Sequence, residues 1–211
     1  MEAAMAGRPR EFDRDKALAN ARDAFWARGY EGTSMADLVA ALGIASARIY
    51  AAFGSKRDLF QEAVGLYEAG DGGVATRALG EAQTARQAIE KMLFEAIENC
   101  TRPGRPQGCM IVSAATNCTA ENDEVLDWLA ERRMEQTERI IARLKQGVAE
   151  GELKPDTDTQ MLGDYFATIM RGLSVQARDG VACARLLGFV PVAMQAVDAV
   201  LANQAAATGK E

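Results

Sequence analysis

The segment from residue 33 to residue 60 constrains the fold most strongly, because it predicts two short helices joined at a glycine. The apolar residues of the first helix recur at helical spacing: Met35, Leu38, Val39 and Leu42. One face of this helix can therefore be buried. Gly43 follows directly and can adopt the left-handed conformation of a tight helix end, with Ile44 entering the core. Two helices joined by a turn of about three to four residues form the helix-turn-helix of DNA-reading proteins.

The second helix of this pair has one face to bury and another left free. Ile49 and Phe53 lie four residues apart and share a face. The residues that fall mainly on other sides are Ser46, Ala47, Arg48 and Tyr50. Since Ile49 and Phe53 can hold the helix to a core, we expect these other side chains to meet a DNA groove.

The flanking segments complete a three-helix module. Upstream, Asp13 can cap a helix that ends at Arg28 and Gly29. The apolar positions of that helix are Ala17, Leu18, Ala21, Phe25 and Trp26. Downstream, Ser55 is placed to cap a helix that begins at Lys56. Its apolar stripe consists of Leu59, Phe60, Ala63, Val64 and Tyr67.

A short basic arm precedes the module. Residues 7–10 read Gly-Arg-Pro-Arg, without apolar periodicity. Arms of this composition enter the minor groove, where the potential of DNA is most negative. We therefore expect Arg8 and Arg10 to contact DNA. Three residues at helix starts or on the second helix suit phosphate oxygens: Thr33, Tyr50 and Lys56.

These residues together resemble the amino-terminal signature of the tetracycline-repressor (TetR) family of bacterial transcriptional regulators. The matching positions are Phe25, residues 29–34, Gly43, Ile44, Tyr50, Phe53, Lys56, Leu59 and Phe60. The resemblance covers about residues 8–68. It implies an all-helical homodimer that binds a palindromic operator on double-stranded DNA, with a divergent carboxy-terminal domain that binds an inducer. It also implies backbone contacts at Thr33, Tyr50 and Lys56, and base contacts at Ser46, Ala47 and Arg48.

Two positions depart from the family pattern. Ala45 stands where a Ser or Thr usually caps the recognition helix, so we expect Ser46 to cap instead and to move the helix start by one residue. Ala51 and Ala52 replace larger side chains. With fewer anchors to the DNA backbone, Tyr50 and Lys56 should matter more.

Composition agrees with a helical regulator in the cytoplasm. The chain has 211 residues, 48% of them hydrophobic, with many helix formers and few β-branched runs, so we expect an all-α fold. No signal peptide or membrane span is evident, and the four cysteines form no C-x-x-C pair. Net charge is −6, but residues 1–60 carry +1 and the remainder −7. The predicted DNA-binding module is therefore the part that phosphate does not repel.

Enzymatic functions are poorly supported. The chain has no histidine, which excludes His-based triads and the zinc protease motif. Residues 70–73 are glycine-rich but lack the Lys-Ser/Thr of a phosphate-binding loop, and predict a flexible joint. We expect no enzyme activity, no cofactor and no metal.

Beyond the module the pattern predicts long helices. We assign residues 1–68 to the DNA-binding domain and residues 69–211 to a sensing and dimerisation domain. The expected helices cover about residues 84–100, 108–118, 123–150, 156–178 and 182–202, with Pro191 kinking the last. Gly163, Ala167 and Gly172 would let another helix approach closely. By resemblance, the last two helices form a four-helix dimer interface with their symmetry mates.

A cysteine at the start of the apolar helix is a candidate sensor. The helix amides and dipole near Cys109 would favour its thiolate, and this Gly-Cys resembles certain electrophile- and oxidant-sensing members of the family. Core packing is the alternative for Cys109. Cys100 or Cys118 could resolve its oxidised form if folding brings them close. The other candidate sensing residues are Met110, Asn117, Phe94, Trp128, Met161 and Tyr165, with Met170, and core packing is an alternative for each.

The sequence therefore predicts a DNA-binding transcriptional repressor that a small molecule or electrophile releases from its operator. Two alternatives remain. Within nucleic-acid binding, the chain could be an activator or an architectural protein without an inducer. From another class, it could be a helical small-molecule carrier or adaptor whose amino-terminal module is vestigial.

Overall fold

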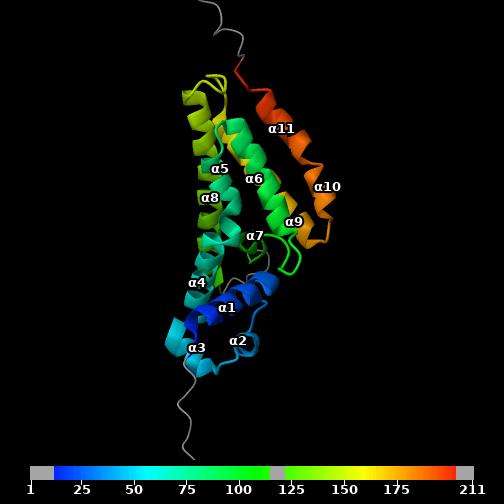
Figure 1. Cartoon of the computed structure of the whole chain (residues 1–211). Helices are drawn as coiled ribbons and strands as arrows, with labels where there is room; N and C mark the ends of the chain where they lie inside the picture. The colour runs from blue at the N-terminus through cyan, green and yellow to red at the C-terminus, as the bar shows by residue number, and fades with distance from the viewer. Residues whose placement is uncertain (1–11, 115–121, 203–211) are drawn as a thin grey trace, which may run out of the picture.

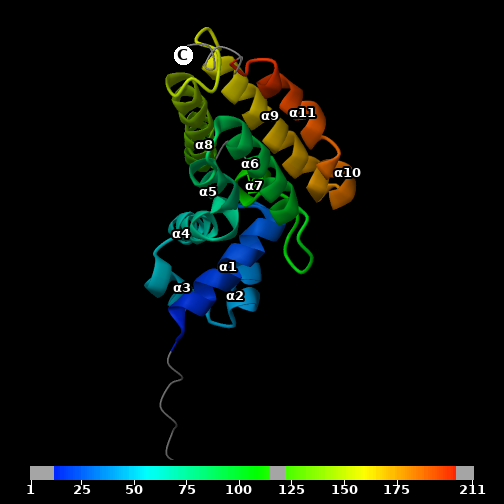
Figure 2. The same ribbon diagram turned by 45° about the horizontal axis from the view of Figure 1, so that its top comes forward.

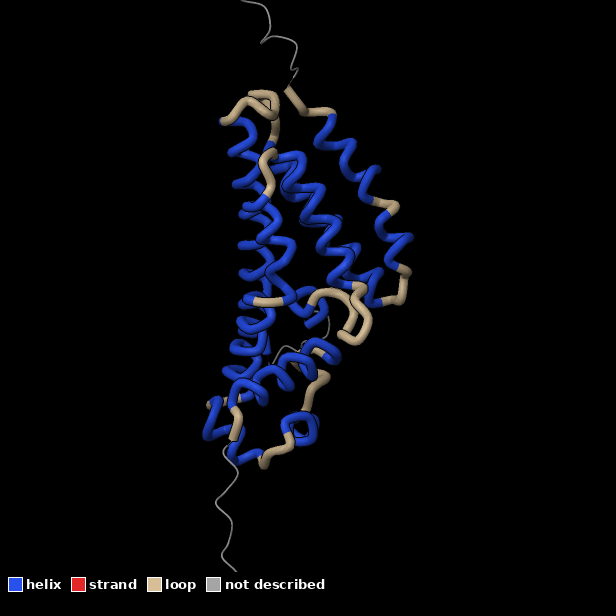
Figure 3. The backbone as a smooth tube through the Cα atoms, viewed as in Figure 1, coloured by secondary structure: helices blue, strands red, loops and turns tan. Residues whose placement is uncertain are grey.

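The computed structural model describes residues 12–114 and 122–202, and within these ranges it is built from helices without a strand (Figure 3). The all-α prediction is confirmed. The helices are α1 (Arg14–Arg28), α2 (Met35–Leu42), α3 (Ser46–Phe53), α4 (Lys56–Ala69), η1 (Asp71–Gly73), α5 (Val74–Glu81), α6 (Ala85–Cys100), α7 (Met110–Ala114), α8 (Asp123–Ala149), α9 (Thr159–Arg178), α10 (Cys183–Leu187) and α11 (Val190–Asp198). Helices α1, α2 and α3 gather at one end, and α6, α8 and α9 run alongside one another in the larger part (Figures 1 and 2).

The caps predicted for α1 and α4 are confirmed. The Asp13 side chain accepts a hydrogen bond from the Lys16 N–H at 3.0 Å. Ser55 forms a capping box with Asp58, in which each side chain bonds to the backbone N–H of the other residue. Ser34 and Asp37 form the same reciprocal pair at α2. These bonds satisfy amides that have no partner inside the helix.

The turn between α2 and α3 has the predicted geometry. Gly43 is left-handed, with φ 69° and ψ 23°, and its N–H closes α2 on the Val39 carbonyl. The two helices meet at 90°. In the described ranges no single helix is long and apolar enough to cross a membrane, and only the pair α2–α3, taken across this bend, meets that test by length and composition.

An aromatic core holds the amino-terminal helices together. The Phe60 ring of α4 packs against Phe25 and Tyr30, with ring centroids 5.1 Å away in each case. The same core contains Met110 of α7 and Leu129 of α8. The division predicted at residue 68 falls within α4, which contacts both parts, and it stays a prediction.

The larger part has the long helices that the sequence predicts. Thr84 caps α6 by accepting from the Gln87 N–H at 3.2 Å. Helix α8 has its expected bounds within one residue. Helix α9 begins at Thr159, about three residues later than expected, because Asp158 caps it.

The glycine-rich stretch is not the flexible joint that we predicted. Residues 71–73 form η1, and α5, which the sequence analysis missed, begins at Val74. Ion pairs fix this corner: Asp71 accepts from Arg102 at 3.0 Å and lies 3.9 Å from Arg105. The two arginines come from the loop after α6, so this loop is tied to η1.

The end of the chain also differs from the prediction. Residues 182–202 form two helices instead of one kinked helix, with the break at Gly188 and Phe189. Pro191 lies in the first turn of α11, where its missing N–H costs nothing. Of the helix expected at residues 108–118, the structure describes Met110–Ala114, and the remainder lies outside the described residues.

Candidate DNA interface and sensing cavity

Helix α3 presents the two faces that its sequence predicts. Ile49 and Phe53 are 2% and 4% exposed and lie in the amino-terminal core. The residues expected to face DNA are all exposed: Ser46, Ala47, Arg48 and Tyr50. Tyr50 is 49% exposed. The core contacts therefore fix the helix while its other face remains available to a ligand.

The start of α3 differs from the prediction. Ala45, not Ser46, is the cap residue, and no side chain caps the helix. Ser46 is already the first helical residue, so its hydroxyl does not take the expected capping role. The amides of this first turn therefore lack a capping side chain, and such amides can bind a phosphate.

Thr33 does not present its side chain as we expected. It is 0% exposed, and its hydroxyl donates to the Gly29 carbonyl at 2.7 Å. The side chain therefore stabilises the connection between α1 and α2 and is unavailable to a phosphate. Lys56 is partly buried, and its Nζ lies 4.3 Å from the centroid of the Tyr30 ring. This contact orients the ammonium group at the start of α4.

Several basic residues of the module are already paired with acids. Arg14 pairs with Glu62 at 2.7 Å, Arg28 pairs with Asp37, and Arg57 pairs with Glu124. Arg48 has no ion pair within the described ranges. Its charge is thus available on the exposed face of α3. Arg8 and Arg10 lie outside the described residues.

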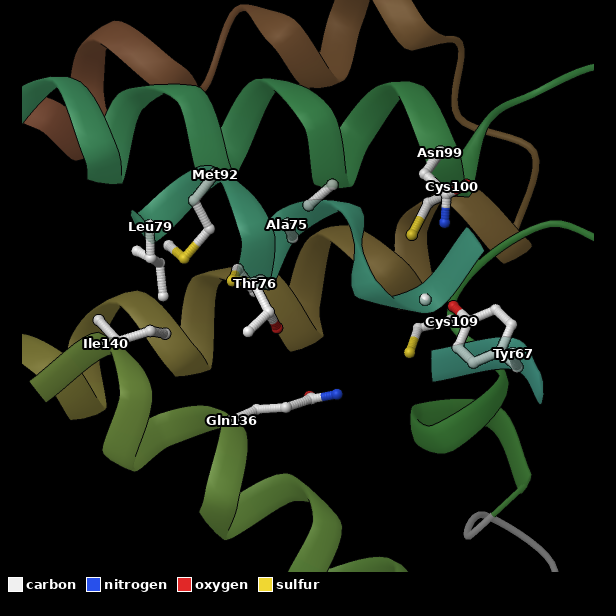
Figure 4. A pocket seen from close by; sticks show the side chains of 13 residues that line it. Tyr67, Ala75, Thr76, Leu79, Met92, Asn99, Cys100, Cys109, Gln136 and Ile140 are labelled. Atoms are coloured by element: carbon white, nitrogen blue, oxygen red, sulfur yellow. The ribbon is translucent and has the colours of Figure 1, made fainter. Parts of the chain in front are cut away.

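Two adjoining cavities of about 50 Å³ each lie in the larger part, and Figure 4 shows the first of them. Residues of both cavities include Cys100, Cys109, Gln136, Ile140 and Met170. The first cavity is also lined by Tyr67, Gly72, Ala75, Thr76, Leu79, Met92, Ala96 and Asn99. The cysteines predicted as sensor and partner, Cys109 and Cys100, therefore share a cavity wall.

Most of the other predicted sensing residues lie elsewhere. Met161, Tyr165 and Phe94 are 66%, 38% and 37% exposed, because they lie off the buried faces of α9 and α6. Trp128 packs against Phe60 at 6.1 Å between ring centroids, and Met110 is buried in the same amino-terminal core. Asn117 and Cys118 lie outside the described residues.

The cavity residues that the sequence analysis missed include Tyr67, Asn99 and Gln136. Tyr67 has the spacing of a core residue and is one, so its place beside Cys109 had no separate signal. Asn99 and Gln136 are polar residues on otherwise apolar helix faces, four or fewer positions from Cys100 and Ile140. A polar residue on an apolar helix face was therefore the sequence signal that could have pointed to the cavity.

Cys109 is connected to the DNA-binding module through its neighbour Gly108. The Trp26 Nε1 of α1 donates to the Gly108 carbonyl at 2.9 Å in the interior. The Cys109 N–H donates to the Ser174 hydroxyl of α9 at 2.8 Å. Gly108 has φ 77°, and a Cβ there would lie 2.9 Å from the Ser174 carbonyl oxygen. Only glycine fits this crossing of α1, α7 and α9.

Burial determines how the other titratable groups of the cavity behave. It raises the pKa of the Cys100 thiol to about 12, with a smaller contribution from the charge of Cys109. Burial also raises the pKa of Tyr67 well above its ordinary value, and Cys109 adds to this. Cys100 and Tyr67 therefore stay protonated near neutral pH. Cys109 is only partly buried.

Small residues of α9 let another helix approach closely, as predicted, and that helix is α8 of the same chain. Gly163 is buried against α8, where a Cβ would lie 2.3 Å from Ile141 Cγ1, and Ala167 is 4% exposed. They allow α8 and α9 to pack closely within one chain. Only Gly172 of the three is exposed. In the described ranges no three His, Cys, Asp or Glu side chains are grouped to hold a metal ion.

A helix-turn-helix with an exposed second helix, joined by α4 to a helical body with an internal cavity, defines a class of DNA-binding transcriptional regulators. Residues 17–63 match the family "Bacterial regulatory proteins, tetR family", and residues 85–181 match "Tetracyclin repressor-like, C-terminal domain". The chain belongs to the TetR family. Members of this family are regulators and not enzymes.

Named relatives agree with this assignment. The chain is 33% identical over 185 residues to the HTH-type transcriptional repressor ComR of Escherichia coli (strain K12), covering 86% of this chain and 87% of ComR. It is 42% identical to the solved TetR family regulator CifR, with a TM-score of 0.86, covering 89% of this chain and 98% of that one. That CifR is a cysteine mutant complexed with 26-bp double-strand operator DNA. A second CifR mutant with operator DNA gives the same identity and TM-score.

Proposed function

We propose that this protein is a dimeric repressor that binds a palindromic operator and is released by a small molecule or electrophile acting at the Cys109 cavity. The observation that carries the proposal is the link from Cys109 through Gly108 to Trp26 of α1. A regulator that binds DNA works where the DNA lies, which for a bacterial regulator is the cytoplasm.

In the proposed complex, α3 lies in the major groove. Ser46, Ala47 and Arg48 face the bases, while Tyr50 and Lys56 contact phosphates. The exposure of this face and the unpaired charge of Arg48 support these roles. The arm residues Arg8 and Arg10 would add contacts in the minor groove. The CifR complexes support operator binding as the activity of the fold.

Exposed apolar side chains support α9 and α11 as the dimer interface. Met161 and Val192 are 66% and 61% exposed, and Tyr165 and Val175 of α9 are 38% and 45% exposed. Large apolar groups that remain in water favour burial against a partner. A two-fold axis between such surfaces sets two copies of α3 against successive turns of the major groove.

The proposed release begins at the cavity. Its volume of about 50 Å³ leaves little room for an added group on Cys109, so modification displaces the segment that carries Gly108. That segment is bonded to α1 through Trp26, and Arg178 at the end of α9 donates to the Ala27 carbonyl of α1 at 3.0 Å. Displacement of the Gly108 segment therefore moves α1 relative to the larger part of the chain. This movement changes the distance between the two α3 helices of the proposed dimer.

A mobility shift on the DNA that flanks the protein's own gene tests this proposal. The protein should retard one palindromic fragment at nanomolar concentration and leave an unrelated fragment unbound. Treatment with N-ethylmaleimide should abolish the shift for the wild type and spare it for Cys109→Ser. A carrier with a vestigial module would retard neither fragment, and an architectural protein would retard both equally. Retained release in Cys109→Ser would contradict the role of this cysteine.

A further inference from the structure

Two arginines lie beside the Cys109 cavities without an acid to balance their charges. Arg171 of α9 lines the second of the two adjoining cavities, together with Cys109. Arg133 of α8 is its neighbour, and the Arg171 Nη2 donates to the Arg133 carbonyl at 2.9 Å. In the part of the chain that the structure describes, neither guanidinium group forms an ion pair. The two positive charges are therefore available to an anion from outside the chain.

Hydrogen bonds hold the Arg171 side chain in place. Its Nη2 also donates to the Thr137 hydroxyl at 2.8 Å, and that hydroxyl donates to the Arg133 carbonyl at 3.0 Å. Thr137 is 8% exposed, so the Nη2 group is anchored on a buried part of α8. Within the described ranges the hydrogen bonds of this guanidinium all come from Nη2. The N–H groups of Nε and Nη1 therefore remain free to donate to a ligand.

Burial makes this pair of positive charges costly. Arg133 and Arg171 are each partly buried. Burial and then the charge of Arg171 lower the pKa of Arg133 below its ordinary value, whereas the nearby Cys109 raises it. No carboxylate of the described residues contributes to this shift. An anion bound between the two guanidinium groups would offset their repulsion and would form charge-assisted hydrogen bonds.

The space beside Arg171 suits a short organic acid. The second cavity measures about 50 Å³, several times the ~10–15 Å³ that one water molecule needs. Ala167 and Met170 supply apolar wall, and Gln136 supplies an amide. The Gln136 side chain extends from α8 toward the space in front of the Cys109 sulfur (Figure 4). A carboxylate on a short carbon chain therefore finds both donors and apolar contacts here.

We propose that Arg171 and Arg133 form an anion subsite beside Cys109, which binds the carboxylate of a small organic acid. Arg171 donates to the carboxylate through Nε and Nη1, and Arg133 adds a second positive charge. This inference rests on the proposed function, since it names the ligand class for the cavity at Cys109. Among electrophiles of similar size, the subsite favours those that carry a carboxylate.

Iodoacetate and iodoacetamide test the subsite, because they are similar in size and only iodoacetate carries a carboxylate. Both react in the same way: the thiolate sulfur attacks the CH₂ carbon, an S–C bond forms and iodide leaves. Mass spectrometry on the full chain without DNA gives the rate constant of each reagent at Cys109. A change in the thiolate fraction alters both rate constants equally. The ratio of the iodoacetate constant to the iodoacetamide constant therefore reports on the charge of the reagent alone.

In the folded wild type, this ratio at Cys109 should be about tenfold higher than in the same chain unfolded in urea. Arg171→Met removes the donors and the charge at similar length, and should lower the ratio about tenfold. Arg133→Met should lower it by a smaller factor. Arg139→Met is the matched control, because Arg139 is an exposed arginine of α8 without a hydrogen bond or ion pair in the described ranges. This variant should keep the wild-type ratio.

A ratio at Cys109 that is the same in the folded and the unfolded wild type would overturn the proposal, and this measurement needs no variant. An unchanged ratio in both Arg171→Met and Arg133→Met would also overturn it. An equal fall in Arg139→Met would assign the preference to overall charge and would refute the subsite. Loss of operator binding would refute the proposed function alone, whereas an unchanged ratio with intact release by N-ethylmaleimide would refute only the anion subsite.

Discussion

The indole Nε1 of Trp26 donates a 2.9 Å hydrogen bond to the carbonyl oxygen of Gly108, the residue before Cys109. This bond joins the first helix of the DNA-binding module to the cavity wall. Trp26→Phe should remove the donor and leave the buried carbonyl unpaired, at a cost of about 1–3 kcal/mol in the free energy of unfolding. The variant should still bind operator but should need more alkylation for release.

Urea unfolding and a mobility shift at increasing N-ethylmaleimide measure the two effects. Trp128→Phe is the matched control, because Trp128 packs against Phe60 in the same core but makes no hydrogen bond to the segment at Gly108. It should leave the dose for release unchanged. An unchanged dose in Trp26→Phe as well would show that the bond carries no signal.

Substitution of Arg48 should change which DNA sequence is preferred, whereas substitution of the phosphate-contacting residues should change the affinity for all DNA. Arg48→Ala should relax the preference at one base position by about 1–3 kcal/mol. Tyr50→Phe and Lys56→Ala should instead weaken binding to all sequences, and Lys56→Ala should lower the salt slope by about one. Selection from a random DNA pool and titrations at several salt concentrations measure these effects.

Charge loss elsewhere provides the controls for this comparison. Arg185→Ala and Lys145→Ala remove exposed charges of α10 and α8, outside the module. Neither should change the consensus or the salt slope. A consensus unaltered by Arg48→Ala would contradict base reading by this residue.

The sequence predicted the amino-terminal module well, because each of its signals is local. Gly43 ends the helix before it, and Ser55 caps the helix after it. The burial of Phe60 can be predicted from the apolar periodicity of α4 alone. The Thr33 side chain is not placed as we expected, because a hydroxyl can bond equally well to a phosphate or to a backbone carbonyl. Here the Gly29 carbonyl lies within 2.7 Å, which no local pattern reveals.

The cavity could not be predicted in the same way. Cys100 and Cys109 are near each other in sequence, but Tyr67, Asn99 and Gln136 reach the wall from three different helices. Apolar periodicity predicts that a side chain is buried, but it does not predict which residues of other helices the side chain contacts. Met161 and Tyr165 show the opposite error, since their pattern is that of a buried stripe while their face points outward.

Met161 tests the proposed dimer interface. Met161→Lys would place a charge without a partner between two apolar surfaces, so the dimer should weaken about hundredfold or more. Light scattering at micromolar concentration should then give the mass of one chain. Met134→Lys is the control, since Met134 of α8 is 65% exposed, close to the 66% of Met161. A dimer that persists in Met161→Lys would place the interface on another face.

The capping boxes predict how stability changes in acid. Hydrogen bonds from the Ser55 side chain and then from its backbone hold the pKa of Asp58 below its usual 3.8. Asp58 therefore stabilises the fold above pH 3.8, and this stabilisation is lost as the pH falls through the lowered pKa. Asp58→Asn should be less stable than the wild type at pH 7, and the gap should narrow below about pH 4.

Urea midpoints between pH 3 and pH 7 measure this gap. Asp127→Asn on α8 is the comparison, because Asp127 is exposed and makes no hydrogen bond within the described ranges. Its midpoints should follow those of the wild type throughout. A constant gap for Asp58→Asn across the whole range would contradict the assigned role of its ionisation.

The last prediction ranks the cysteines by reactivity. Thiolates react with electrophiles and thiols do not, and burial raises the pKa of Cys100 to about 12, so Cys100 should react slowest in the folded protein. Cys109 is partly buried on the cavity wall and should react faster than Cys100, Cys118 and Cys183. Competitive alkylation followed by mass spectrometry gives the ranking directly. Labelling of Cys109 at or below the rate of Cys183, which is also partly buried, would favour a reversible ligand over covalent modification as the releasing signal.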